Sequence, residues 1–379
     1  MPSRHSNFTR RSFLGASAAA SAAFAIGAAA EPLLAWKTTR EFASAASSDA
    51  VFINANENPL GPCTSARTAI ANVAPYGGRY RFEAMEELVK SYAQQEGIKE
   101  SYVKIYPGSS TPLHYAVLAF TSPKASYVTA DPSFEQGMMS CKDSGARVVK
   151  VPLTKDYAHD VKAMLAAAPD AGLFYVCTPN NPTGTMTSHA DVEYLVTNKP
   201  KGSIVMIDEA YIHFTDATST LDLVKADRDV VVLRTMSKIY GMAGLRCGFA
   251  IARPDLLERI ERYAGWISMP VTAVAAASAS FKDQALLSER RHINTTVRQE
   301  TFDWLKQRGY SFVPSESNCF MLDAKRPARE TIAAMAHQNI HIGRVWPIWP
   351  THVRITVGTA EEMERFRTAF HQVMSGAKA

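Results

Sequence analysis

The sequence of 379 residues has little cysteine, little excess charge and no strongly apolar run of membrane-spanning length. Its five cysteines are scattered, none is paired at metal-ligand spacing, and their odd number argues against a disulfide scaffold. The formal net charge is only +5, and this balance does not favour a nucleic-acid partner. Neither a Gly-x-Ser-x-Gly elbow nor a His-Glu-x-x-His pair is present, which argues against the common serine and zinc hydrolases.

The first 30 residues resemble an export signal. The segment Thr9-Arg10-Arg11-Ser12-Phe13-Leu14 is similar to the twin-arginine motif, and an Ala-rich run with small residues before Glu31 follows it. A membrane anchor is the alternative, but this run is short and only weakly apolar. We expect residues 1–30 to be a signal peptide for the twin-arginine export machinery, residues 31–50 to be a linker, and the mature protein to be periplasmic or secreted without a stable membrane span.

Short apolar runs alternate with helical patterns through the middle of the chain. Buried parallel strands are typically continuous apolar runs, so this alternation predicts an α/β fold with a mostly parallel sheet flanked by helices. The expected strands are 127–130, 147–151, 173–177, 204–207, 230–233 and 248–251. The pattern changes near Pro270, where a long helix, two strands and a final helix indicate a smaller α+β domain. The expected domains are an N-terminal arm at 51–75, a large cofactor-binding domain at 76–270 and a small C-terminal domain at 271–379.

The segment 234–246 places one lysine among hydroxyl groups, small residues and arginine, directly after an apolar run. A pyridoxal phosphate site needs a lysine that forms an imine, an anion near the pyridine nitrogen, phosphate donors and a cation for the substrate carboxylate. A surface position is the ordinary alternative for any lysine. The surroundings of Lys238 nevertheless predict that it forms the imine.

Two other polar segments also follow apolar runs. Asp208 ends one expected strand, where it would serve either as the anion near the pyridine nitrogen or as a helix N-cap. Asn180–Gly184 follows another expected strand and, taken alone, indicates a turn. Because α/β sheets bind ligands at the carboxyl ends of their strands, three such segments on one sheet predict a shared crevice. Gly108-Ser109-Ser110 opens an expected helix, whose backbone amides would hold phosphate.

These segments, together with Asn56–Pro62 and Arg354–Gly358, resemble fold-type I aminotransferases of class I and II, and within them histidinol-phosphate aminotransferases. The resemblance covers roughly residues 51–375. It implies a homodimeric transaminase that uses pyridoxal 5'-phosphate to move an amino group between a small-molecule amino donor and an oxo acceptor, either a 2-oxo acid or a ketone.

The resemblance also implies a role for each matching residue. Lys238 would form the imine and later move the proton, while Asp208 would pair with the pyridine nitrogen. Asn181 and Tyr211 would bond the ring oxygen, and Phe134 would stack on the ring. The phosphate would be held by Ser109, Ser110, Thr235, Ser237 and Arg246, joined by Tyr80 of the neighbouring subunit. The segment Arg79-Tyr80-Arg81 departs from the family because it lacks the usual proline.

Arg354 would take the substrate α-carboxylate, and Arg344 matches the family position that grips a substrate phosphate. The following Trp346-Pro347-Ile348-Trp349 is unusual, and its tryptophans belong either to the core or to a different substrate pocket. Arg344 favours a phosphorylated donor such as histidinol phosphate, whereas the export leader favours another amine or amino acid. Decarboxylation, racemisation and C–S elimination on the same fold remain alternatives, as does a non-catalytic cofactor-binding protein.

Overall fold

The fold is described from a computed structural model, in which residues 49–265 and 268–376 are placed well enough to describe. The expected signal peptide and most of the expected linker lie outside these residues. Within them, no helix is both long enough and apolar enough to cross a membrane. The five cysteines all lie within these residues, and each is buried and free.

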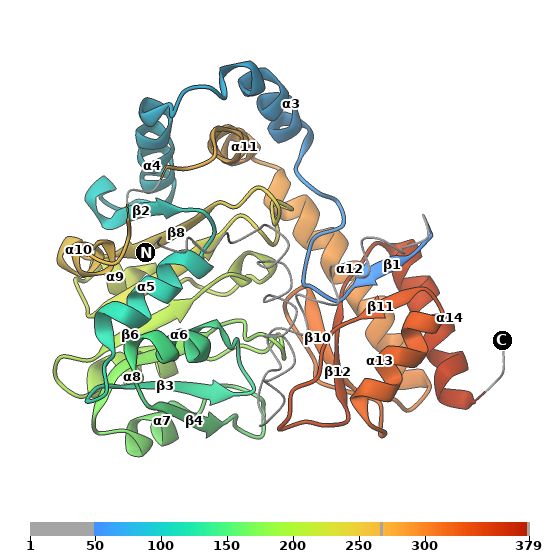
Figure 1. Ribbon diagram of the computed structural model, residues 1–379. Coiled ribbons are helices and arrows are strands. Elements are labelled where there is room, and N and C mark those ends of the chain that lie inside the picture. Colours follow the sequence, from blue (N-terminus) through green and yellow to red (C-terminus); the bar gives the residue numbers. More distant parts are fainter. Residues whose placement is uncertain (1–48, 266–267, 377–379) are drawn as a thin grey trace, which may run out of the picture. The chain divides into compact units, whose positions relative to one another are not determined.

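A seven-stranded sheet forms the centre of the larger body in the described part of the chain (Figure 1). Its strand order is β2-β8-β7-β6-β5-β3-β4. The strands are β2 (Val103–Tyr106), β3 (Ser126–Asp131), β4 (Val148–Pro152), β5 (Ala171–Cys177), β6 (Ile204–Asp208), β7 (Val230–Thr235) and β8 (Gly248–Ala252). Strands β4, β3, β5, β6 and β7 pair in parallel, which confirms the predicted fold class.

The expected strand 248–251 is an antiparallel member of this mostly parallel sheet. Strand β8 runs antiparallel to both of its neighbours, β7 and β2. Every residue of β8 is buried, as in the parallel strands β5, β6 and β7. A continuous apolar run reports burial on both faces of a sheet and carries no information on strand direction.

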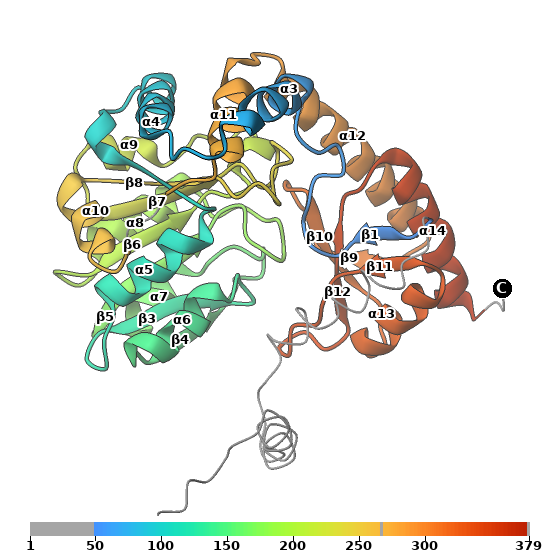
Figure 2. The same ribbon diagram turned by 45° about the horizontal axis from the view of Figure 1, so that its top comes forward.

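Helices cover both faces of this sheet, which explains why β5, β6, β7 and β8 are buried along their whole length (Figure 2). Alternate residues of one strand point to opposite faces, so Phe174 and Tyr175 of β5 belong to two different cores. One core includes residues of α3 (Thr64–Val73), α4 (Phe82–Glu96), α7 (Val161–Ala167), α8 (His189–Asn198), α9 (Leu221–Lys225) and α11 (Val271–Lys282). The other includes residues of α5 (Ser110–Phe120), α6 (Gln136–Ser144) and α10 (Pro254–Glu261).

A smaller body follows, built on a three-stranded antiparallel sheet in the order β12-β10-β9 among the described residues. Its strands are β9 (Ser311–Phe312), β10 (Cys319–Asp323) and β12 (His352–Thr356), and its helices are α12 (Leu286–Gln307), α13 (Ala328–His337) and α14 (Ala360–Ser375). The last helix begins with a capping box between Thr359 and Glu362, which satisfies backbone donors at its first turn.

The N-terminal arm joins the smaller body through strand pairing. Strand β1 (Val51–Ile53) pairs in parallel with β11 (Ile340–Ile342), and the chain then runs without regular secondary structure to α3. Helix α11 packs against α3 and α4, so the larger core extends beyond residue 270. The proposed domain limits of 76–270 and 271–379 stay predictions. Three short 3-10 helices complete the described elements: η2 (Ala74–Tyr76), η3 (Glu100–Tyr102) and η4 (Ile212–Phe214).

Candidate active site

The three strand-end segments meet at one edge of the large sheet. Strands β5, β6 and β7 are neighbours and run in the same direction, so their carboxyl ends lie together. Cys177, the last residue of β5, pairs in register with Asp208, the last residue of β6. The loops that follow these strands carry Asn181, Tyr211 and Lys238. The structure therefore brings together the residues that the sequence placed after separate strands.

Asp208 is a buried carboxylate that accepts two hydrogen bonds. The hydroxyl of Tyr175 donates to its Oδ2 at 2.8 Å, and the backbone N–H of Ala210 donates to its Oδ1 at 3.1 Å. Burial raises the pKa of Asp208, and these two hydrogen bonds together with the charge of Lys238 oppose that shift. A cationic N–H placed against this carboxylate would offset its desolvation, which suits the pyridine nitrogen of pyridoxal phosphate.

The Lys238 amine lies across the same crevice. Its Nζ donates to the backbone oxygen of Asn56 at 3.0 Å and lies 5.6 Å from the centre of the Tyr211 ring. Burial, followed by the positive charge of Arg354, lowers the pKa of Lys238 to about 8. Lys238 and Asp208 each act on the other's pKa, so the two groups share one site. A depressed pKa leaves more of the amine neutral, as a nucleophile requires.

A hydrogen-bonded network connects this crevice to the smaller body. Asn56 donates from its Nδ2 to the hydroxyl of Tyr211 at 3.0 Å and to Oδ1 of Asn181 at 3.5 Å. The same Oδ1 accepts from Nη1 of Arg354 at 2.8 Å. Asn56 is 1% exposed and has a φ of 54°, a left-handed conformation that asparagine tolerates better than most residues. The resemblance implied a site role for Asn181 and Tyr211, whereas Asn56 received no role from the sequence.

The expected phosphate residues form a polar cradle beside Lys238. Nη1 of Arg246 donates to the hydroxyl of Ser237 at 3.3 Å, and its Nη2 donates to the hydroxyl of Ser110 at 3.4 Å. Thr235 in turn donates from its hydroxyl to that of Ser237 at 2.9 Å. Ser109 is the N-cap of α5, so the first amides of this helix face an end that favours anions. Helix dipole, guanidinium and hydroxyls make this set suitable for a phosphate group.

Two glycines allow the cradle to close. A Cβ on Gly248 would lie 2.4 Å from the backbone nitrogen of Ser109, so only glycine lets β8 approach the start of α5 this closely. Gly108 has a φ of +83°, and a Cβ there would lie 2.1 Å from Nη2 of Arg246. Side chains at these positions would push the helix terminus and the arginine apart. The backbone here thus suits the binding of an anion by both groups together.

Arg354 is held at the base of the substrate side. It lies in β12, is 6% exposed, and donates from Nη2 to the backbone oxygen of Asn54 at 2.6 Å. Its Nε is buried without a hydrogen-bond partner in the ranges that the structure describes. Burial lowers the pKa of this guanidinium, and its unbonded Nε leaves it without a full set of acceptors in the described chain. An incoming carboxylate is a chemically suitable acceptor for it.

Three other predicted residues lie at the margin of this group. Phe134 follows β3, is half-buried and packs against the core that contains α5 and α6. Arg344 forms an ion pair with Glu135 at 2.5 Å, a partner that sequence reasoning missed because the two lie 209 positions apart. Tyr80 is 57% exposed and stacks on Phe82 at 5.6 Å. The expected role of Tyr80 concerns a second subunit and stays a prediction.

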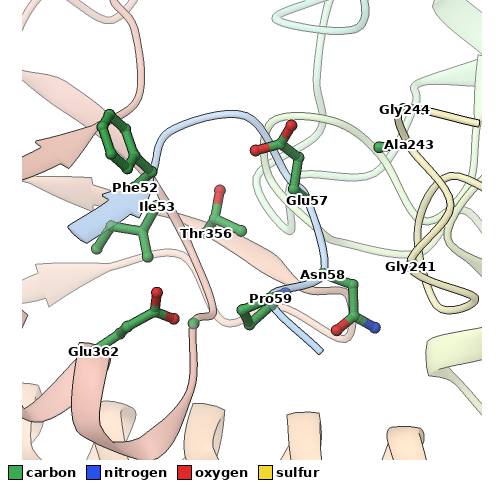
Figure 3. A pocket seen from close by; sticks show the side chains of 11 residues that line it. Phe52, Ile53, Glu57, Asn58, Pro59, Gly241, Ala243, Gly244, Thr356 and Glu362 are labelled. Carbon is green, nitrogen blue, oxygen red and sulfur yellow. The ribbon is translucent and has the colours of Figure 1, made fainter. Parts of the chain in front are cut away.

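A cavity of about 360 Å³ opens beside the lysine loop (Figure 3). One wall comes from the arm, where some of the residues between Phe52 and Pro59 line the cavity. The small residues of the loop after Lys238 and the start of α14 form the rest of the lining. Glu57 of the arm lies on one wall of the cavity, and Ala243 and Gly244 of the loop lie on another (Figure 3). Asn58 ties the arm to the loop, because its Nδ2 donates to the backbone oxygen of Ile239 at 3.0 Å. The cavity therefore lies between the arm and the lysine loop, and neither Lys238 nor Asp208 nor Arg354 lines it.

Sequence reasoning also missed Tyr175, which bonds Asp208 from within strand β5. Its signal was hidden, because a tyrosine in an apolar run resembles an ordinary core residue. Cys319 was interpreted only as a scattered thiol, yet its Sγ accepts from Nδ2 of Asn56 at 3.1 Å. The position of Cys319 at the start of β10 makes it part of the same network, which no local pattern indicates.

Comparisons with known proteins agree with this geometry. A family model described as aminotransferase class I and II matches residues 48–370. The chain is 31% identical over 334 residues to a histidinol-phosphate aminotransferase of Moorella thermoacetica, an alignment covering 86% of each protein. It is 32% identical over 332 residues to an aromatic amino acid aminotransferase of Cutibacterium acnes, covering 86% of this chain and 94% of that protein.

A solved structure of a relative has the same fold. The crystal structure of histidinol-phosphate aminotransferase from Sinorhizobium meliloti in complex with pyridoxal-5'-phosphate matches with a TM-score of 0.82 and 25% identity, over 93% of this chain and 96% of that chain. The chain belongs to the class I and II aminotransferases. It is a pyridoxal-phosphate-dependent aminotransferase, as the sequence predicted, and its polar cradle, buried Asp208 and Lys238 fit that cofactor.

Proposed function

We propose that this enzyme moves an amino group between an amino acid and a 2-oxo acid or ketone, with Lys238 as the proton carrier and Arg354 as the carboxylate ligand. One observation carries this proposal. A lysine amine and a buried carboxylate lie at the carboxyl ends of neighbouring strands, and one hydrogen-bonded network through Asn56 and Asn181 joins the lysine to an arginine whose Nε has no partner among the described residues.

Each cofactor contact has a candidate residue. When bound, pyridoxal phosphate supplies an aldehyde that condenses with amines and a ring that accepts the electrons of a broken Cα–H bond. Asp208 would keep the ring nitrogen protonated, while Asn181 and Tyr211 would bond the ring oxygen. Phe134 would cover one ring face. The phosphate would lie against Ser109, Ser110, Thr235, Ser237 and Arg246.

Lys238 would act twice. Its Nζ would hold the cofactor, and a donor amine would replace it there. The free Nζ would then be the group that takes the α-proton of the donor and returns it on the cofactor side. The pKa of Lys238 is about 8 in the ligand-free chain, so a useful fraction of the amine is neutral near that pH.

Arg354 would orient the donor. A carboxylate that accepts from a buried guanidinium has only a few allowed poses, and each of them limits where the α-hydrogen points. Because Nη1 of Arg354 also donates to Asn181, the carboxylate site is tied to a residue beside the ring. The α-hydrogen and the Lys238 amine are thereby brought into one reacting geometry.

Lys238→Ala tests the assignment. The variant should lose turnover and the visible absorption band of the lysine-bound cofactor, while Lys90→Ala, a change at an exposed helix position, should keep both. The two proteins should have the same circular dichroism. Retention of the band in Lys238→Ala would show that another amine binds the cofactor and would overturn the assignment.

The active unit is proposed to be a homodimer in which Tyr80 reaches the cofactor phosphate of the other subunit. The support is that Tyr76, Tyr80 and Phe82 are 59%, 57% and 46% exposed, a large aromatic surface ahead of α4. Sedimentation should give twice the chain mass, and Tyr80→Phe should weaken cofactor binding. A fully active monomer would contradict this part of the proposal.

Export through the twin-arginine route is proposed on the strength of Arg10 and Arg11 with the Ala-rich run behind them. A reporter that is already folded, fused behind residues 1–48, should reach the periplasm. A matched fusion with both arginines changed to lysine should remain inside the cell. Equal export of the two fusions would exclude this route.

A further inference from the structure

The substrate side of the crevice contains an ion pair that the proposed function does not use. Nη2 of Arg344, which follows β11, lies 2.5 Å from Oε2 of Glu135, which precedes α6. The two side chains are 35% and 30% exposed, so the pair lies at the surface of the crevice. Glu135 belongs to the larger body and Arg344 to the smaller one. The pair therefore spans the two bodies directly after the predicted ring-stacking residue Phe134.

A buried indole links this pair to the carboxylate ligand. The guanidinium of Arg344 lies 4.6 Å from the ring centre of Trp346, and that of Arg354 lies 5.4 Å from the same ring. Trp346 is 1% exposed. After the main effect of burial, the charges of Arg344 and Glu135 both influence the pKa of Arg354. The ion pair is thus adjacent to the predicted α-carboxylate site, where a donor's side chain would begin.

A cluster of aromatic and apolar side chains lies next to this ion pair. Trp346 packs with Val313 and Met321, and Trp349 and Tyr157 pack against this cluster. The backbone N–H of Trp349 donates to the oxygen of Trp346 at 2.9 Å, which folds the two tryptophans into one turn. Of the two alternatives that the sequence left open for the tryptophans, the structure supports the core. Because both Arg344 and Arg354 lie against the Trp346 ring, the substrate side has aromatic surroundings.

The charges at the substrate side of the crevice determine which donor side chains it can bind. A phosphate monoester carries about −1.5 to −2 charges at pH 7 and needs donors that are free to face it. Arg344 would be the matching donor, but its positive charge is already balanced by the carboxylate of Glu135. A phosphate near Arg344 would also lie near this carboxylate, and like charges at such a contact are unfavourable. An uncharged ring meets no such opposition.

We propose that Glu135 determines substrate specificity: by pairing with Arg344 it excludes phosphorylated donors, and the crevice takes an amino acid with an uncharged aromatic or large apolar side chain. This inference rests on the proposed function, because it assumes that Arg354 receives the α-carboxylate. It assigns Arg344 to the ion pair, in place of the phosphate contact that the family resemblance implied.

A pair of non-reacting analogues tests this proposal on the loaded enzyme. α-Methyl-L-tyrosine and its O-phosphate have no α-hydrogen, so they bind without completing amino transfer and differ only in the phosphate. Dissociation constants come from calorimetry and from the change in cofactor absorbance. The wild type should bind the unphosphorylated analogue about tenfold more tightly or better, since like-charge contacts of this kind cost more than 1.4 kcal/mol.

Glu135→Gln should reduce or reverse this preference, because Arg344 is then free to bond the phosphate. Glu258→Gln, which removes the carboxylate of an exposed ion pair with Arg262, is the matched control and should leave the preference unchanged. Arg344→Gln should bind the unphosphorylated analogue within about threefold of wild type, as expected for a residue whose charge the donor does not use.

Different results would contradict the proposed function and the role of Glu135. Absence of the Lys238-dependent absorption band overturns the proposed function, and this inference with it. A normal band with equal or tighter binding of the phosphorylated analogue by wild type overturns only the role of Glu135. The same conclusion follows if Glu135→Gln leaves the ratio of the two dissociation constants unchanged.

Discussion

The cofactor end and the substrate end of this crevice are assembled in different ways. The cofactor end draws Asp208, Thr235, Lys238 and Arg246 from two neighbouring strands and the loops that follow them. At the substrate end, Arg354 bonds Asn54 and Asn181, which lie 300 and 173 positions away in the chain. The first arrangement follows from the edge of one parallel sheet, whereas the second exists only once the two bodies pack together.

The two ends also differ in how their charges are satisfied. At the cofactor end, Asp208 is buried with two hydrogen-bond donors and no bonded cation in the described chain, and burial raises its pKa. At the substrate end, Arg344 already has Glu135 as its partner. Incompletely matched charge thus marks the described positions that are proposed to receive a charged group, Asp208 for the ring nitrogen and Arg354 for the carboxylate, whereas Arg344 is already matched.

Asp208→Asn should produce the largest effect if this division is correct. The amide cannot hold the ring nitrogen protonated, so kcat should fall by roughly 10²–10³-fold, as for loss of a major electrostatic contact in other active sites. The dissociation constant of the donor should change little. Steady-state rates and binding of the α-methyl analogue measure the two effects, with Asp170→Asn, at an exposed ion pair, as the control. A loss confined to donor binding would break the comparison.

Arg354→Gln should affect the substrate end by a smaller amount. Loss of a charge-assisted bond to the carboxylate should lower kcat/KM for donor and acceptor by roughly 10–100-fold, mainly through KM. Cofactor retention should stay near that of wild type. Arg365→Gln, at an exposed ion pair with Asp49, is the matched control. If the variant loses cofactor as readily as it loses donor, the two ends are not separable.

Arg246→Gln should act at the cofactor end alone. The cofactor dissociation constant should rise about tenfold, because one charged donor to the phosphate is lost while the helix terminus and hydroxyls remain. Dialysis followed by absorbance measures this retention, and Arg262→Gln is the surface control. Among molecules that keep the cofactor, donor affinity should be unchanged. A rise in donor KM without cofactor loss would place Arg246 elsewhere in the mechanism.

The sequence predicted the cofactor end more fully than the substrate end, for a physical reason. Strand ends of a parallel sheet are adjacent by topology, so Asp208 and Lys238 were found from short apolar runs and the polar residues after them. Glu135 and Arg344 meet only through packing of the two bodies, and no periodicity encodes that contact. Asn56 received no role at the sequence level for the same reason, because its hydrogen-bond partners lie 125 to 300 positions away in the chain.

Lys238 lies where the two ends meet, and its titration gives the most sensitive comparison. Its pKa of about 8 is below the value of about 10.4 expected in the unfolded chain. Between these values the unfolded state binds more protons, so this group makes the ligand-free protein gain stability as pH rises from 8 to 10.4. Lys238→Met should therefore be more stable than wild type at pH 7, by about 1–3 kcal/mol, and this advantage should vanish near pH 10.4. Chemical denaturation at several pH values measures it.

The charge of Arg354 couples the substrate end directly to the amine of Lys238. After burial, the charge of Arg354 is the largest influence that lowers the pKa of Lys238. Arg354→Gln should therefore raise that pKa, by less than about one unit, because the buried environment of the amine remains. The pH dependence of amine acylation in the ligand-free protein reports the shift, and Arg365→Gln should leave it unchanged. An unshifted profile in Arg354→Gln would mean that the carboxylate ligand does not tune the catalytic amine, and that the two ends work independently.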